Sequence, residues 1–170
     1  VEGNFEYWRR CVELSHVVRF DEGGKLQFSR QDSEDVFVFG ADVFDKGSGD
    51  IRIARTLLDF KDAHRDRVFL LAGNRDLNKL RLTAEMVESD IDVPYPVPEY
   101  PRAPPQISYR SFLERLASTE GVTLEEANCQ ANRLRWILTH TMTAPAAFEH
   151  RREELALLRG QDGSDAISDD

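Results

Sequence analysis

The stretch VFVFGADVFDKG, residues 36–47, decides the fold class of this chain of 170 residues. Its first four residues form a short apolar run of β-branched and aromatic side chains, which is typical of a strand buried on both faces. A polar loop that carries Asp42 and Asp45 follows this strand directly. The stretch VFLLAGNRD, residues 68–76, repeats the arrangement, because a second apolar run ends in a polar loop. The sequence therefore predicts two buried strands with polar groups at their ends.

A helix is predicted between the two strands, over residues 48–64, with Ser48 as its cap and Asp50 in its first turn. Its apolar face is predicted to carry Ile51, Ala54 and Leu58. A further helix is predicted over about 77–89. Alternation of strand and helix favours an α/β fold with a parallel βαβ core and a right-handed crossover.

The rest of the chain divides into parts of different composition. Residues 92–106 form a Pro-rich spacer that holds six of the seven prolines and cannot form a helix or a central strand. Residues 107–160 have helical patterns and are predicted to be a helical insertion or continuation. Residues 161–170 are predicted to be an acidic disordered tail. Residues 1–91 then form the first structural unit.

Helix signals accompany these parts. Asn4 suits the cap of an N-terminal helix, and residues 20–35 are predicted to be a polar loop. Beyond the spacer, three helices are predicted over about 108–118, 123–138 and 145–159. Trp8 and Trp136 fall at positions that favour a place in the core over a binding platform.

Charge and composition exclude several functions. The net charge of −9 argues against a nucleic-acid polymer as partner, because the phosphate backbone would repel the chain. No run of 18 apolar residues occurs, so neither a transmembrane helix nor a membrane partner is expected. Cys11 and Cys129 lack metal-ligand spacing and are expected to be reduced thiols in a cytoplasmic protein. The start of the chain has no Met and no signal pattern, and is interpreted as a cut inside a domain.

The two polar loops carry the residues that are candidates for binding and catalysis. Asp42, Asp45, Asn74 and Asp76 are expected to converge, because ligands bind outside the carboxyl ends of strands in such sheets. Carboxylate and amide oxygens suit hard divalent cations such as Mg²⁺ or Mn²⁺. The cations Lys46 and Arg75 would suit a phosphate ester, and a pair of metal ions could clamp its phosphoryl group and activate water.

These motifs resemble those of the calcineurin-like phosphoesterases, which include the Ser/Thr phosphatases and the diadenosine tetraphosphatases. That family carries D-x-H-G, then G-D-x-x-D-R-G, then G-N-H-(D/E). This chain has VEGN at residues 1–4, DVFDKG at 42–47 and GNRD at 73–76, in the same order and after the same strand slots. The resemblance covers roughly residues 1–90. It implies a partial calcineurin-like phosphoesterase sandwich that hydrolyses phosphate esters with a divalent metal cofactor, as two ions of Mn, Mg, Fe or Zn.

The resemblance also implies individual roles. Asp42 matches the carboxylate that bridges both metals, and Asn74 matches an amide ligand of the second metal. Asp45 matches a residue that orients the site from behind the ligands. Lys46 stands in place of an Arg that holds substrate phosphate, and Asp76 in place of an acid that supports a histidine.

The sequence departs from the family at several positions. Glu2 replaces a histidine ligand, although a carboxylate can still bind a hard cation. Arg75 replaces the general-acid histidine; its guanidinium stays protonated and can only stabilise charge on the phosphate. The first family Asp would lie just before Val1. His140 and His150 are not convincing counterparts of the later histidine ligands, and a capped or solvated role is preferred for His140.

Simpler interpretations of the same residues remain open. The loop at Asp42 and Asp45 could be a turn with side-chain caps, and Asn74 and Arg75 a turn residue and a surface cation. The chain could then be a non-catalytic module that binds a metal or phosphate without hydrolysis. It could also act as a docking protein, with a protein partner on its Pro-rich and helical region. The substrate of the leading hypothesis is a phosphate ester of phosphoprotein or nucleotide type.

Overall fold

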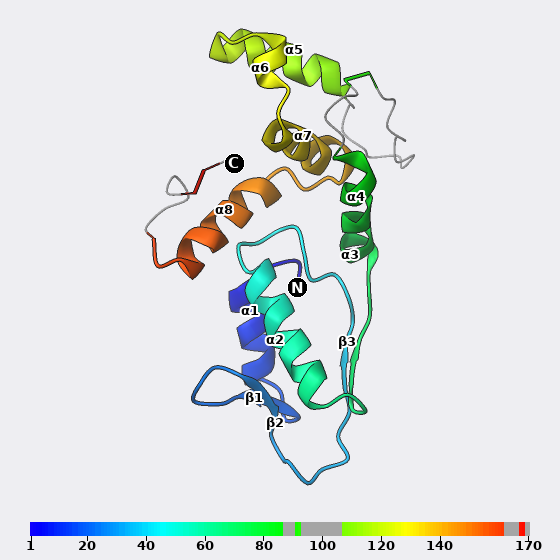
Figure 1. Ribbon diagram of the computed structural model, residues 1–170. Helices are drawn as coiled ribbons and strands as arrows, with labels where there is room; N and C mark the ends of the chain where they lie inside the picture. Colours follow the sequence, from blue (N-terminus) through cyan, green and yellow to red (C-terminus); the bar gives the residue numbers. More distant parts are fainter. Residues whose placement is uncertain (87–90, 93–106, 162–166, 169–170) are drawn as a thin grey trace.

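The computed structural model describes residues 1–86, 91–92, 107–161 and 167–168 of the chain and shows a mixed α/β fold (Figure 1). Strand β3 (Phe37–Phe39) and strand β4 (Val68–Leu70) pair in parallel, with Phe37 opposite Val68 and Phe39 opposite Leu70. Helix α2 (Asp50–Ala63) connects them. The predicted parallel βαβ core is therefore present.

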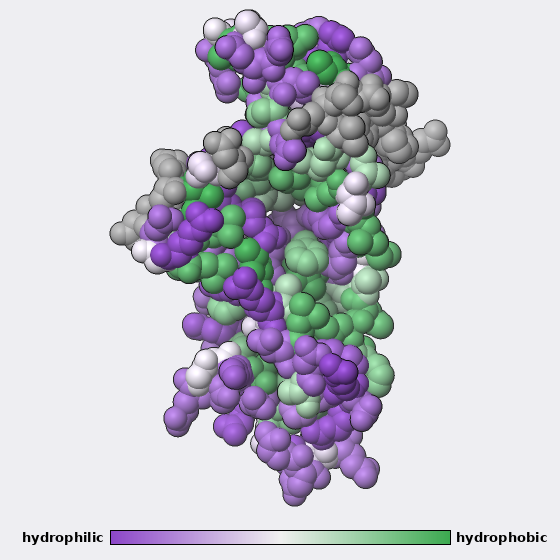
Figure 2. Space-filling view, viewed as in Figure 1, coloured by the Kyte–Doolittle hydropathy of each residue, from purple (hydrophilic) through white to green (hydrophobic). Residues whose placement is uncertain are grey.

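The prediction that both faces of these strands are buried is wrong. Phe39 and Val68 belong to the core, but Val38 is 57% exposed, Phe69 46% and Leu71 56%. Helices α1 (Phe5–Glu13) and α2 pack on one face only, and no described residue buries the other. The uncovered apolar side chains form a green band beside β3 and β4 in Figure 2.

The core-facing side of α2 differs from the expectation by one or two residues. Ile53, Leu57 and Phe60 are buried, whereas Leu58 is exposed. Together with α1 and the strands they form the first hydrophobic core, which contains Trp8, Val12, Val18, Leu26, Phe28, Phe39, Ile53, Leu57, Phe60 and Val68. Trp8 is thus a core residue, as the sequence indicates.

A hairpin occupies part of the segment that was expected to be a polar loop. Strand β1 (Val18–Phe20) pairs antiparallel with β2 (Leu26–Phe28). The turn is closed by Asp21, whose carboxylate accepts hydrogen bonds from the backbone N–H of Gly23 and of Lys25. Phe28 is fully buried, so the hairpin contributes to the first core.

The third predicted helix begins earlier than expected and is broken into short pieces. These are α3 (Asn74–Asn78), the 3₁₀ turn η1 (Lys79–Arg81) and α4 (Leu82–Glu85). Residues 87–89 of the prediction lie outside the described residues. So do most of the Pro-rich spacer and most of the tail.

The helical part contains α5 (Tyr109–Glu120), α6 (Leu124–Ala127), α7 (Gln130–Trp136), the π-helical turn η2 (Ile137–Thr141) and α8 (Ala147–Leu158). Ser108 caps α5 and Thr123 caps α6, because each hydroxyl accepts a backbone N–H. The prediction of a single helix over 123–138 is wrong, because Asn128 and Cys129 interrupt the helix and separate α6 from α7. A second core forms here around Tyr109, Leu113, Trp136, Ile137 and Met142.

None of the helices in the described part of the chain has the length and apolar character needed to cross a bilayer. Cys11 and Cys129 are both exposed and carry free thiols.

Candidate functional site

The loop that follows β3 and the loop that follows β4, which we call the strand-tip loops, meet at what we call the strand-tip site, and Asp76 joins them. Its carboxylate accepts hydrogen bonds from the backbone N–H of Asp42 at 2.9 Å, of Val43 at 2.8 Å and of Gly73 at 2.9 Å. Two of these donors belong to the loop after β3 and the third to the loop after β4. Because one carboxylate satisfies backbone groups of both loops, Asp76 fixes the distance between them.

Asp42 faces the start of α3. Its Oδ1 accepts a hydrogen bond from the backbone N–H of Arg75 at 3.2 Å. Gly73 permits this approach, since a Cβ at that position would lie 2.2 Å from the same oxygen. Asn74 is exposed at the first position of α3, next to the N–H that binds Asp42. The two residues predicted to share a cation therefore come from adjoining loops.

The loop backbone carries conformational strain. Ala41 has a φ of 77° and Asp42 a φ of 55°, so two consecutive non-glycine residues lie in the left-handed region, and Asp45 has a φ of 109°. Each such residue costs about 1–3 kcal/mol. Backbone hydrogen bonds hold the loop in place against this cost, because Glu2 donates its N–H to the carbonyl of Asp42 and accepts the N–H of Lys46.

Glu2 and Lys46 form a close ion pair at the edge of the site. The Lys46 ammonium contacts the two carboxylate oxygens of Glu2 at 2.8 and 2.7 Å, and the Arg75 guanidinium lies 3.7 Å from Glu2. The hydrogen bond from Lys46, together with its charge and that of Arg75, lowers the pKa of Glu2 despite partial burial. Glu2 is therefore an anion whose charge is balanced from within the protein.

Asp45 is the buried acid of the site. Its side chain is fully buried and pairs with the guanidinium of Arg75, at 3.3 Å, and with the ammonium of Lys79. Arg75 Nη1 also donates to the carbonyl of Met142 at 3.0 Å and to the hydroxyl of Thr143 at 3.3 Å. The helical part of the chain thus reaches the strand-tip site and helps to fix Arg75.

Lys79, Met142 and Thr143 were missed by sequence reasoning. A signal existed for Lys79, since it lies four residues after Arg75 and therefore on the same side of a helix. No local signal marks Met142 or Thr143, because they reach Arg75 across 67 and 68 residues of chain.

An open cavity of about 550 Å³ lies over the strand-tip site. Among its lining residues are Glu2, Asp42 and Lys46, together with Tyr7 of α1, which is 58% exposed. The predicted residues that line this cavity are thus two acids and one cation. Asp45 lies behind them and belongs instead to the wall of a second cavity.

A divalent cation finds suitable donor atoms here, but no complete ligand set. Within the described residues, no three or more His, Cys, Asp and Glu side chains are grouped to hold a metal ion. Glu2 and Asp45 are engaged by cations and Asp76 by backbone N–H groups. The Asp42 carboxylate has no ion pair with a described cation and receives one hydrogen bond, so its oxygens fit a hard cation.

The histidines of the helical part have other surroundings. His140 packs edge-on against Phe112, with ring centroids 6.1 Å apart, and burial lowers the pKa of His140. His150 lies 3.4 Å from Glu153 on the same helix. Trp136 is buried, as expected of a core residue, and its indole N–H donates to the carbonyl of Ile107.

No family model, curated protein or solved structure matches the chain. The resemblance to calcineurin-like phosphoesterases therefore depends on the order of three motifs and on the strands that precede the second and the third.

Proposed function

We propose that this protein is a metal-dependent hydrolase of phosphate esters, of phosphoprotein or nucleotide type, and that residues 1–91 form part of a calcineurin-like phosphoesterase sandwich. The observation that supports this proposal is the meeting of the two strand-tip loops, with Asp42 hydrogen-bonded to the start of α3. Motifs from separate strands have to meet in this way if they are to share one ligand.

In this proposal Asp42 is the principal metal ligand, and Asn74 and Glu2 supply further oxygen donors. A bound pair of Mn, Mg, Fe or Zn ions would supply an activated water and would neutralise charge on the phosphoryl group. Glu2 would have to exchange its contact with Lys46 for the metal. Lys46 would then be free of Glu2, and its ammonium would be available to a substrate phosphate.

The remaining residues act on charge and position. Arg75 is held by Asp45, Met142 and Thr143, so its charge is fixed beside Glu2, 3.7 Å away, where it would stabilise negative charge that develops on the phosphate. Arg75 cannot serve as a proton donor, because a guanidinium does not lose its proton near neutral pH. Asp76 keeps the two loops at a constant separation.

A second candidate function is a binding module for phosphate or metal without hydrolysis. One observation favours it: Glu2 and Asp45 are already neutralised by Lys46, Arg75 and Lys79. We also propose a protein partner that binds the Pro-rich and helical region. The free thiols of Cys11 and Cys129 suggest a cytoplasmic location.

The test is turnover of p-nitrophenyl phosphate with added Mn²⁺ by the wild-type chain, by Asp42→Asn and by Asp59→Asn. Asp59 is an exposed carboxylate on α2 away from both loops, which makes it a matched control. We expect Asp42→Asn to lower turnover by about 100-fold, as for loss of a metal-site residue, and Asp59→Asn to leave it unchanged.

Calorimetric titration with Mn²⁺ and with inorganic phosphate separates the two candidates. Saturable binding without turnover by the wild-type chain would select the binding module. Equal turnover by Asp42→Asn and Asp59→Asn would exclude the strand-tip site as the functional centre. The absence of both binding and turnover in the wild-type chain would exclude it as well.

A further inference from the structure

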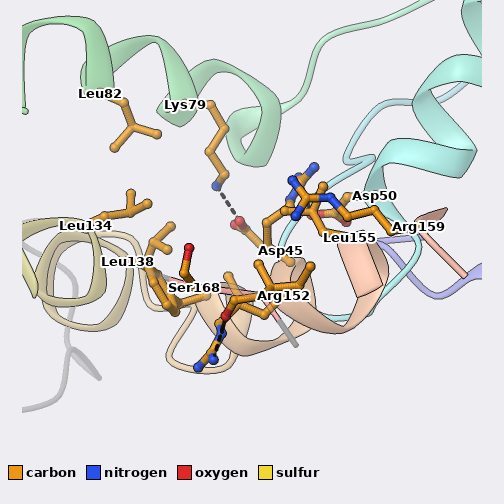
Figure 3. A pocket seen from close by; sticks show the side chains of 14 residues that line it. Asp45, Asp50, Lys79, Leu82, Leu134, Leu138, Arg152, Leu155, Arg159 and Ser168 are labelled. Carbon is orange, nitrogen blue, oxygen red and sulfur yellow. Dashed lines mark hydrogen bonds and ion pairs between the residues drawn. The ribbon is translucent and has the colours of Figure 1, made fainter. Parts of the chain in front are cut away.

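A second cavity lies between the helical part and the strand-tip site. It has a volume of about 330 Å³, which is within the range of small-molecule sites in proteins. Helix α8, helix α7 and the α3–α4 region form its walls, and Figure 3 shows its lining side chains. We call it the α8 cavity.

The α8 cavity has an apolar wall. In Figure 3, Leu82, Leu134 and Leu138 lie together on one side, from α4, α7 and the π-helical turn. Phe148 and Leu155 of α8 and the buried Ile167 add further apolar surface. A ligand that fills this space needs an apolar body, because a polar group placed against these side chains would lose its hydrogen bonds to water.

The charged residues of the cavity are mostly cations. The four cations that line it are Lys79, Arg151, Arg152 and Arg159. The two carboxylates are those of Asp45 and Asp50. Both carboxylates already have cationic partners, since Asp45 pairs with Lys79 and Arg75, and Asp50 lies 3.5 Å from Arg151. The cavity therefore favours an anionic group over a cationic one.

Arg159 is the cation most available to a ligand. Arg152 donates to the carbonyl of Ile167 and pairs with Glu149. The Arg159 side chain, by contrast, makes no hydrogen bond or ion pair with any residue in the described ranges, and Figure 3 shows it at the side of the cavity opposite the leucines. An apolar wall facing a free guanidinium matches a molecule with an apolar body and one anionic end.

We propose that the α8 cavity binds a small organic anion, with its apolar body against Leu82, Leu134 and Leu138 and its carboxylate, sulfonate or phosphate group at Arg159. This binding does not depend on hydrolysis at the strand-tip site. Asp45 connects the α8 cavity with the strand-tip site. Lys79, which lines the cavity, pairs with one oxygen of its carboxylate, and Arg75 of the strand-tip site pairs with the other.

Fluorescence titration with anilinonaphthalene sulfonate, an apolar ring system with one sulfonate, tests the proposal on the whole chain. We compare the wild type with Arg159→Ala, with Ser168→Trp and with Arg55→Ala. Ser168 is an exposed residue on the cavity wall, so a tryptophan there fills the cavity without replacing a core side chain. Arg55 is an exposed arginine on α2 and serves as the matched control.

We expect Arg159→Ala to weaken the saturable binding of the probe about tenfold, as for loss of one charge-assisted hydrogen bond, and Ser168→Trp to abolish it. Arg55→Ala should bind as the wild type does. The probe also adsorbs to exposed apolar surface such as the β3–β4 face, and this component should be the same in all four proteins.

Displacement tests the charge of the ligand. Decanoate should displace the bound probe, whereas decanol, with a similar apolar chain and no charge, should not. The proposal is overturned if Arg159→Ala and Ser168→Trp both bind as the control does, or if decanol competes as well as decanoate.

Discussion

At the scale of single residues, Asp50 shows how burial changes the behaviour of an acid. It is the first residue of α2, and its Oδ1 is buried without a hydrogen-bond partner among the described residues. Burial raises the pKa of Asp50 from 3.8 to about 6, although Arg151 acts in the opposite direction. Near neutral pH the protein therefore holds a charged carboxylate in a place that disfavours it.

This environment predicts a pH dependence of stability. The folded protein binds the Asp50 proton more tightly than the unfolded chain, so the contribution of Asp50 to the free energy of unfolding is highest below about pH 4 and decreases as the pH rises through about 6. Asp50→Asn should remove this decrease, which corresponds to at most about 3 kcal/mol. Urea unfolding of both proteins from about pH 4 to about pH 7 measures the difference. Asp59→Asn should keep the wild-type slope, and an unchanged slope in Asp50→Asn would refute the assignment.

The two loops that the sequence predicts to converge do meet. Asp42, Asp45 and Asp76 lie in the two loops that meet, because polar groups at the carboxyl ends of parallel strands are brought to one edge. The functions of these residues stay predictions. The sequence does not show which acid pairs with which cation. Thr143 reaches Arg75 only because the helical part folds back onto the loops, whereas Lys79 reaches Asp45 from the turn that directly follows α3.

At the scale of elements, α2 and α8 are joined through a cap that one helix supplies to the other. Gly49 precedes α2 and has no side chain for capping. Glu154 of α8 takes this place, since its carboxylate accepts the N–H of Ile51 at 2.8 Å and of Arg52 at 2.9 Å. Glu154 is fully buried, and the Arg52 guanidinium lies 3.5 Å away. The contact therefore stabilises α2 and positions α8.

Replacement of this carboxylate should be costly. Glu154→Ala leaves two N–H groups of α2 without an acceptor and the Arg52 guanidinium without its carboxylate, and we expect a loss of about 2–5 kcal/mol in the free energy of unfolding. Glu153→Ala, at the neighbouring exposed position of α8, should change it by less than about 1 kcal/mol. Urea unfolding followed by circular dichroism measures both, and equal losses would mean that the cap is unimportant.

The elements that sequence patterns missed are short or depend on distant contacts. The β1–β2 hairpin has three residues in each strand, and its apolar positions, Leu26 and Phe28, stand among polar residues that resemble a loop. The helix expected over 123–138 has continuous helical spacing, but Asn128 packs with Tyr109, whose hydroxyl donates to its side chain at 2.9 Å. A tertiary contact thus accompanies the break between α6 and α7.

At the scale of the whole molecule, the two hydrophobic cores are separate, and polar contacts through Arg75 and Glu154 are among those that connect them. Phe60 is in the centre of the first core and Leu113 in the centre of the second. Because each core buries its own residues, we expect the two halves to open independently.

Hydrogen exchange tests this independence. Phe60→Ala, which should cost about 3–5 kcal/mol, is expected to lower protection in α1, α2 and the β1–β2 hairpin and to leave α5 and α7 protected. Leu113→Ala serves as the reciprocal case, with protection lost in α5 and α7. A uniform loss across the chain in both proteins would show that the molecule unfolds as one unit.

The exposed side of β3 and β4 also has a consequence for handling and for engineering. Within the described residues each strand has a neighbour on one side only, so both outer edges offer unsatisfied backbone groups next to exposed Val38, Phe69 and Leu71. Such an edge is a template on which an added peptide can build a further strand. The chain is therefore suited to fragment complementation, in which a synthetic β-strand pairs with an open edge of the sheet and satisfies its backbone groups.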